Sequence, residues 1–87
     1  MNELQDVVVT ETEQAIFSCT VNKEGVPVKW TFEKSPIQSN EKFRVVVIGK
    51  QHQLFVENCN FDDEGRYRAQ IGSRQTSGSL TVKGLLI

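Results

Sequence analysis

Three groups of side chains in this 87-residue sequence are of types that could do chemistry: one histidine, His52, an acidic run at residues 62–64, and two cysteines. A histidine can act as a general base or as a metal ligand. His52, however, directly follows the turn-forming residues 49–51, and no nucleophile motif accompanies it. We therefore expect His52 to be a solvated turn residue and the chain to have no catalytic residues.

The acidic run Asp62-Asp63-Glu64 could bind a divalent cation weakly. It lacks the alternating ligands and the central glycine of a calcium-binding loop. No glycine-rich phosphate-binding loop follows any of the strands predicted below. These patterns predict no metal site and no cofactor, and they indicate a domain that is not an enzyme.

Cys19 and Cys59 lie 40 residues apart, and neither belongs to a CxxC pair. A zinc site is therefore not indicated. Counting alone leaves a disulfide between them open, but the strand pattern places both as small apolar side chains in different layers of the core. We favour two buried free thiols. Together with the absence of any Asn-x-Ser/Thr acceptor, this predicts a reducing compartment.

The composition excludes several classes of partner. Lys plus Arg is 10 and Asp plus Glu is 11, so the formal net charge is 10 − 11 = −1, which argues against nucleic-acid binding. No apolar run approaches the roughly 20 residues of a membrane-spanning helix. The first six residues are acidic where a signal peptide is basic, so we expect no secretory leader. The length predicts one domain over residues 1–87.

The elements that position the histidine, the acidic run and the cysteines are predicted to be β-strands. Apolar and polar residues alternate with a period of two along most of the sequence, which is typical of strands. This alternation is found in residues 15–22, 28–33, 43–48, 54–56, 65–71 and 80–82, and a short edge strand is predicted at 7–9. We expect Ser35-Pro36 to end the second of these runs, because proline cannot donate to a central ladder. Gly72-Ser73 and Ser77-Gly78 are expected to mark turns. About seven short strands spaced by about 10 residues predict an all-β antiparallel sandwich or barrel.

Two motifs narrow this fold class. Cys19 is followed 11 residues later by Trp30, and Leu54-Phe55-Val56 is followed by Asp63-Glu64-Gly65-Arg66-Tyr67-Arg68-Ala69. This pattern resembles the B-strand Cys, C-strand Trp, E-strand Leu-x-Val and F-strand Asp-x-Gly-x-Tyr-x-Cys of immunoglobulin domains, over essentially the whole chain. The resemblance implies a structural core made of Phe17, Cys19, Trp30, Leu54, Val56, Cys59, Tyr67, Ala69 and Leu80.

The Asp63-x-Gly65-x-Tyr67 stretch is the most specific part of the resemblance. It implies a corner turn in which the Tyr67 hydroxyl donates to backbone, Gly65 permits a tight turn and Asp63 accepts local backbone donors. We expect all three residues to be structural.

Ala69 stands where the second immunoglobulin cysteine would be, so the usual disulfide between strands B and F cannot form. This departure is typical of the intermediate set (I-set) of intracellular immunoglobulin domains in giant muscle proteins of the titin family, with the obscurin, twitchin and myosin-binding protein families as alternatives. The resemblance implies a load-bearing module of a tandem array in the cytoplasm, at the sarcomere or myofibril, where it would contribute to elasticity and sarcomere organisation. Its implied partners are neighbouring immunoglobulin domains and other sarcomeric or cytoskeletal proteins, and residues 84–87 would begin an interdomain linker. A kinase elsewhere in a parent protein stays open.

A recognition module is the alternative function. Arg66 and Arg68 share an outward face of their strand, and arginine is enriched at interfaces. The loops at residues 22–26 and 72–76 are further candidates. An extracellular adhesion domain is a third and weaker alternative, which Ala69 and the missing glycosylation acceptors disfavour.

Overall fold

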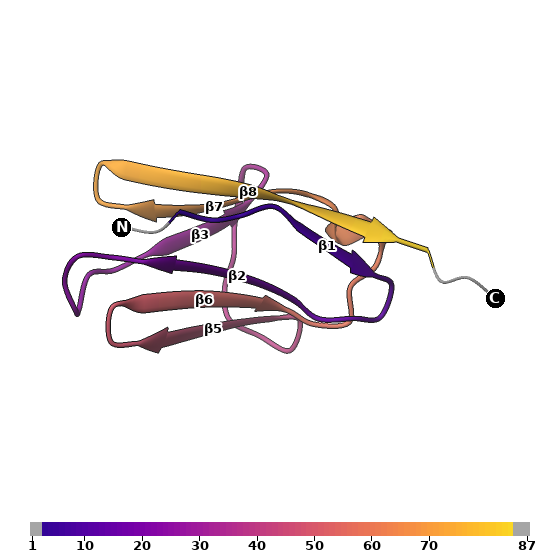
Figure 1. The fold of residues 1–87 in the computed structure, drawn as a ribbon, viewed down its shortest axis with the longest axis horizontal. Coiled ribbons are helices and arrows are strands. Elements are labelled where there is room, and N and C mark those ends of the chain that lie inside the picture. The colour runs from indigo at the N-terminus through magenta and orange to yellow at the C-terminus, as the bar shows by residue number, and fades with distance from the viewer. Residues whose placement is uncertain (1–2, 85–87) are drawn as a thin grey trace.

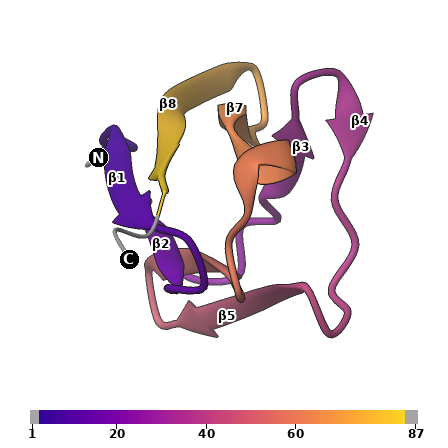
Figure 2. The same cartoon turned by 90° about the vertical axis from the view of Figure 1, so that its right-hand side faces the viewer.

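The computed structural model describes residues 3–84, which form two β-sheets packed face to face (Figure 1). The strands are β1 (Val7–Thr10), β2 (Ala15–Thr20), β3 (Lys29–Phe32), β4 (Ser35–Pro36), β5 (Phe43–Ile48), β6 (Gln51–Val56), β7 (Gly65–Ile71) and β8 (Arg74–Lys83), with a 3-10 turn η1 (Phe61–Asp63) before β7. One sheet has the order β1-β8-β7-β3-β4 and the other β2-β6-β5. Figure 2 shows the two layers end on. The predicted all-β sandwich is confirmed, and β1 with β8 is its parallel pair.

The core lies between the sheets because each strand turns its apolar positions inward. The nine predicted core positions are all at most 3% exposed: Phe17, Cys19, Trp30, Leu54, Val56, Cys59, Tyr67, Ala69 and Leu80. The Tyr67 ring stacks on Phe17 and on Phe32, with centroid distances of 4.9 and 4.6 Å. Offset stacking of this kind adds about 0.5–1.5 kcal/mol per pair beyond area burial.

The prediction of a turn at Ser77-Gly78 was wrong, because both residues lie inside the ten-residue strand β8. The hairpin turn is at residues 72–73, so the predicted 72–76 loop is mostly strand and its Thr76 is buried. Gly78 serves close packing instead of a turn. A Cβ atom there would lie 2.6 Å from the Gln5 carbonyl oxygen.

The residues Ser35-Pro36 do not simply end a strand. β3 stops at Phe32, Glu33 adopts a positive φ of 55°, and the chain returns as β4 against Thr31 and Phe32. Proline is tolerated there because β4 is an edge strand, whose outer N–H positions need no ladder partner.

Both cysteines are free and buried, as favoured from the sequence. Their expected placement in different layers was wrong. Cys19 pairs with His52 in the β2–β6 ladder, and Cys59 follows β6 with its N–H donating to the Glu13 carbonyl, 2.9 Å away. Cys19 therefore lies within β2, and Cys59 lies beside the chain just before β2, so the two are separated along this strand and not by the two layers.

Candidate functional site: the terminal strands and the corner

The first and last strands form what we call the terminal pair, β1 and β8. They run parallel in a register that opposes Val7 to Leu80 and Val9 to Val82. The half-buried Val7 and Val9 pack on the core, and the 58% exposed Val8 faces outward. This alternation is expected of a strand with one face on the core and the other in solvent. Glu11 continues the ladder, its N–H donating to the Lys83 carbonyl at 2.8 Å.

Two side-chain hydrogen bonds extend the terminal pair beyond its ladder. The Leu4 N–H donates to the Thr76 hydroxyl at 3.0 Å in a buried position, and the Ser79 N–H donates to the Asp6 carboxylate at 2.9 Å. Leu4 itself is only 5% exposed. The chain before β1 is therefore attached along the first half of β8.

The direction of the terminal pair decides how a pull on the chain would load it. In Figure 1 both strands run from left to right, so the chain enters β1 from the left and leaves β8 on the right. Opposite pulls on the two ends slide β1 against β8 along their length. All the interstrand hydrogen bonds then lie across the direction of sliding and are loaded together.

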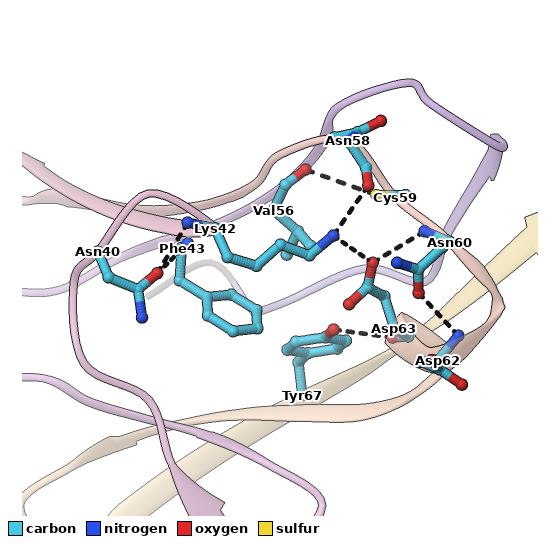
Figure 3. Close-up of polar contacts among 10 residues, drawn as sticks. All are labelled: Asn40, Lys42, Phe43, Val56, Asn58, Cys59, Asn60, Asp62, Asp63 and Tyr67. Carbon is cyan, nitrogen blue, oxygen red and sulfur yellow. Dashed lines mark hydrogen bonds and ion pairs between the residues drawn. The ribbon is translucent and has the colours of Figure 1, made fainter.

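The second part of the site is the corner, residues 58–67, which carries the chain from β6 into β7 (Figure 3). The fully buried Tyr67 hydroxyl donates to the Asp63 carbonyl at 2.8 Å. Asn60 and Asp63 cap η1 reciprocally, because the Asn60 side chain accepts from the Asp62 N–H while the Asp63 carboxylate accepts from the Asn60 N–H, both at 2.9 Å. Such a capping box satisfies donors that the turn leaves free.

Lys42 ties a distant segment to the corner. Its ammonium group lies 2.7 Å from the Asp63 carboxylate and donates to the Asn58 carbonyl at 2.8 Å. The Asp63 side chain is 10% exposed and the Lys42 side chain 29%, so salt screens this pair less than a fully exposed one. Removing one partner of such a partly buried pair costs more than breaking a surface pair.

Burial perturbs the titration of the groups around the corner. Burial first, and then the negative charge of Asp63, raise the pKa of the Tyr67 hydroxyl. Burial also raises the pKa of the Cys59 thiol, with Asp63 adding to it, and burial alone raises the pKa of Cys19. These groups are held protonated, which removes the nucleophilic thiolate.

At Gly65 the φ angle is 147°, and a Cβ atom would lie 2.5 Å from the Glu33 side chain and 2.7 Å from the Phe32 ring. Glycine is thus required by both conformation and space.

Arg66 and Arg68 are both exposed on the outer face of β7. They lie opposite Ser79 and Ser77 of β8, and Arg68 also lies opposite Thr31 of β3. Among residues 3–84 the ion pairs are Lys42–Asp63 and Arg44–Glu57, so neither arginine of this face is in one.

The prediction that His52 is a solvated turn residue was wrong. β6 begins at Gln51, and His52 is 4% exposed on its inner face, between Cys19 of β2 and Val47 of β5. Its Nε2 atom and Trp30 Nε1 are buried with no hydrogen-bond partner among the described residues. The alternation of Leu54 and Val56, continued two residues back, could have identified this position from the sequence.

The described residues contain no group of three or more His, Cys, Asp or Glu side chains arranged to hold a metal ion. Asp62 and Glu64 are exposed. The Asp63 carboxylate already forms an ion pair with Lys42 and accepts a hydrogen bond from the Asn60 N–H. Within residues 3–84, no helix has the length and apolar character needed to cross a membrane.

Comparison with known proteins places this geometry in a family. A family model described as immunoglobulin I-set domain matches residues 1–83. The chain belongs to the immunoglobulin I-set family. The I-set domain is 32% identical over 84 residues to titin of Drosophila melanogaster and 34% identical over 74 residues to cardiac-type myosin-binding protein C of Mus musculus. These alignments cover 97% and 85% of the chain but 0% and 6% of the relatives, so the I-set domain spans only a small part of them.

Solved titin domains have the same fold. The I-set domain superposes on the crystal structure of the titin I9-I11 tandem with a TM-score of 0.95 at 30% identity, covering 97% of this chain and 32% of that one. Against titin domain I10 the TM-score is 0.92 at 36% identity, with 95% and 94% covered. The resemblance inferred from the Cys, Trp and Tyr motifs is confirmed.

Proposed function

We propose that this domain is a load-bearing module of a tandem array in a giant intracellular muscle protein related to titin or myosin-binding protein C. The observation that carries the proposal is the parallel terminal pair, whose shear geometry loads its hydrogen bonds together. Similarity to titin and myosin-binding protein C supports the muscle setting. The role is mechanical, and no catalytic role is assigned to this domain.

The hydrogen bonds of the terminal pair set the expected resistance to force. Forced unfolding is governed by the height of the unfolding barrier and not by equilibrium stability. When two strands are peeled apart from one end, their hydrogen bonds break one after another, and each breaks easily. In shear, the ladder from Val7 to Glu11 and the two side-chain bonds before it must fail nearly at once.

A proline scan along β1 tests this mechanism. Because the Glu11 N–H points at β8, the alternation of a parallel ladder aims the Val9 N–H at β8 and the Val8 N–H away from it. We expect Val9→Pro to lower the unfolding force clearly, since it removes a ladder donor. The matched control Val8→Pro removes a donor outside the ladder and should change the force much less. The measurement is single-molecule pulling through handles at the two chain ends.

Equal unfolding forces for the parent and Val9→Pro would contradict the mechanical proposal. Equal losses in both proline variants would also count against it, because the effect would then come from backbone stiffness and not from the ladder.

The array itself is part of the proposal. We infer that residues 1–87 form one domain, that the linker begins at residue 84, and that the nearest partners are neighbouring immunoglobulin domains of the same chain at the sarcomere. The apolar end Leu85-Leu86-Ile87, expected to pack on a following domain, lies outside the described residues. Sequencing the parent on both sides tests this, since flanking sequence without immunoglobulin patterns would refute the array.

A recognition role is the second candidate, and the exposed arginines Arg66 and Arg68 favour it. A solved complex contains titin M10 and an obscurin-like 1 immunoglobulin domain, which shows that such domains can bind one another. The test is a pull-down from muscle extract with the domain and with its Arg66→Ala/Arg68→Ala variant. A partner lost in the variant supports docking at this face, and identical capture by both excludes it.

A further inference from the structure

One sheet edge is left open. The two sheets have four edge strands in the described part of the chain: β1, β4, β2 and β5. β4 has only two residues and includes Pro36, and β1 and β2 lie beside each other where the chain crosses between the sheets. β5 forms the lower margin of Figure 1, with β6 on its inner side and no strand on the other.

The hydrogen-bonding groups of this edge can be assigned by alternation. The Lys42 carbonyl accepts from the Glu57 N–H at 2.9 Å, so even-numbered residues of β5 direct their backbone groups at β6 and odd-numbered ones direct theirs outward. Asn40 occupies both outward groups of Phe43, its N–H donating to the Phe43 carbonyl at 2.7 Å and its side chain accepting from the Phe43 N–H at 2.9 Å. The N–H and C=O groups of Val45 and Val47 remain without a partner among the described residues.

The side chains around these groups are apolar and exposed. Val47 is 55% exposed and Ile48 is 61% exposed, and Arg44 is the sole charged residue within β5. Natural edge strands are commonly protected by charged side chains, by proline or by a bulge. Between Phe43 and Ile48, β5 has no proline and no bulge, and the stretch from Val45 to Ile48 carries no charge.

We propose that β5 is a homotypic docking edge, on which a second copy of this chain adds antiparallel with Val45 opposite Val47 of the second copy. In this register the two-fold axis passes at Val46, and every outward N–H and C=O of Val45 and Val47 in both copies finds a partner. The neighbouring registers are poorer. The register that places Val45 opposite Val45 of the second copy needs the outward N–H and C=O of Phe43, which already bond to Asn40. The register that places Val47 opposite Val47 leaves Val45 unpaired.

The same register also suits the side chains. Arg44 lies opposite Ile48 of the second copy, so within β5 no like charges face each other directly. Val46 meets its own counterpart, and the exposed Val47 is covered by Val45 of the second copy. The edge is thus self-complementary, which is the requirement for a two-fold interface. This favours a second copy over an unrelated strand.

Sedimentation equilibrium on the purified chain tests the proposal. The interface is short, so we expect a monomer–dimer equilibrium with a dissociation constant of about 0.1–1 mM. Amide exchange followed by NMR supplies the register: the Val45 and Val47 amides should exchange fast in dilute solution and slow down on concentration. The Val46 amide, which bonds to β6, should be protected in both.

Variants separate edge pairing from general stickiness. Val47→Lys should weaken association at least about tenfold by placing a charge on the edge. Val47→Pro should do the same through the backbone, because its outward N–H makes no bond within the monomer. The control Ile16→Thr removes a 44% exposed aliphatic side chain from the far strand β2 and should leave association unchanged.

A chain that stays monomeric at concentrations up to about 1 mM overturns the proposal. So does a dimer that persists in both Val47 variants, as does concentration-independent exchange of the Val45 and Val47 amides. None of these outcomes bears on the mechanical proposal, which rests on the terminal pair in the other sheet.

Discussion

Tyr67 joins the two layers of the domain at the scale of one residue. Its ring stacks between Phe17 of one sheet and Phe32 of the other, and its hydroxyl is anchored to the Asp63 carbonyl. The hydroxyl fixes the corner relative to β7, while the ring supplies core volume. These two contributions can be separated experimentally, because phenylalanine keeps the ring and loses only the hydrogen bond.

Tyr67→Phe should lower the free energy of unfolding by about 1–2 kcal/mol at pH 7, through loss of a buried hydrogen bond. Urea titration of the parent and the variant measures the difference. A variant as stable as the parent would show that the corner holds without this bond. Unfolding cooperativity should be unchanged, since the core volume is kept.

The raised pKa of Tyr67 makes stability depend on alkaline pH. The folded state keeps the hydroxyl proton above the unfolded pKa of about 10, so the unfolded state binds fewer protons there and stability falls as pH rises. The buried thiols start the decline earlier, above about pH 9. We expect the free energy of unfolding of Tyr67→Phe to fall less steeply than that of the parent above about pH 10. Parallel curves would contradict this.

At the scale of elements, the approach of the first segment to β8 depends on Gly78. The Gln5 carbonyl carbon would lie 3.1 Å from a Cβ atom at this position and its oxygen closer still. Because the obstacle is backbone, it cannot be relieved by a change of rotamer. The whole segment before β1 would have to move, with loss of the Leu4–Thr76 hydrogen bond and of Leu4 burial.

Gly78→Ala should therefore destabilise the domain by about 1–3 kcal/mol, within the range for overpacked positions. The control is Ser77→Ala, an exposed neighbour on the same strand, for which we expect a change within about 0.5 kcal/mol. Urea denaturation of the three proteins gives the comparison. An alanine variant at Gly78 that matches the control would mean that the first segment adds little to stability.

At the scale of the whole molecule, the sheets are held together without a disulfide, mainly by side-chain packing. Cys19 and Ala69 occupy the positions that a disulfide would join, and both are buried at 1% and 0% exposure. Ala69 pairs with Trp30 in the β3–β7 ladder, so Trp30 covers the region that the bridge would cross. The stability of the domain then depends on the fit of side chains between the layers.

Ala69→Cys should allow a bridge to Cys19 under oxidising conditions and raise stability by up to about 4 kcal/mol, because it closes a loop of about 50 residues. Melting with and without reductant, together with a thiol count, measures the gain. The Cys19→Ala/Ala69→Cys variant controls for the substitution itself. The parent has two free cysteines, so the variant has three, and a bridge to Cys19 would leave only the Cys59 thiol free. Three free thiols after oxidation would show that the sheets do not bring positions 19 and 69 within bonding distance.

The sequence by itself determined most of the strands, most of their inward faces and the corner, because each depends on local order; β4, the first half of β8 and the inward face of His52 were missed. Alternation with a period of two assigns Phe17, Leu54 and Val56 to one face whatever the partner strand is. The spacing from Asp63 to Tyr67 sets the corner within one turn. The Asn60–Asp63 capping box was missed, although its spacing of three residues is also a local signal.

Only the tertiary structure decided which distant segments meet. Lys42 reaches Asp63, Gln5 lies against Gly78 and β1 runs parallel to β8, and each contact joins parts of the chain that no local pattern relates. The open edge of β5 depends likewise on the order of strands in the sheets. Strand pairing is chosen by the packing of the whole core, because many registers satisfy the same alternation and only one buries every inward face at once.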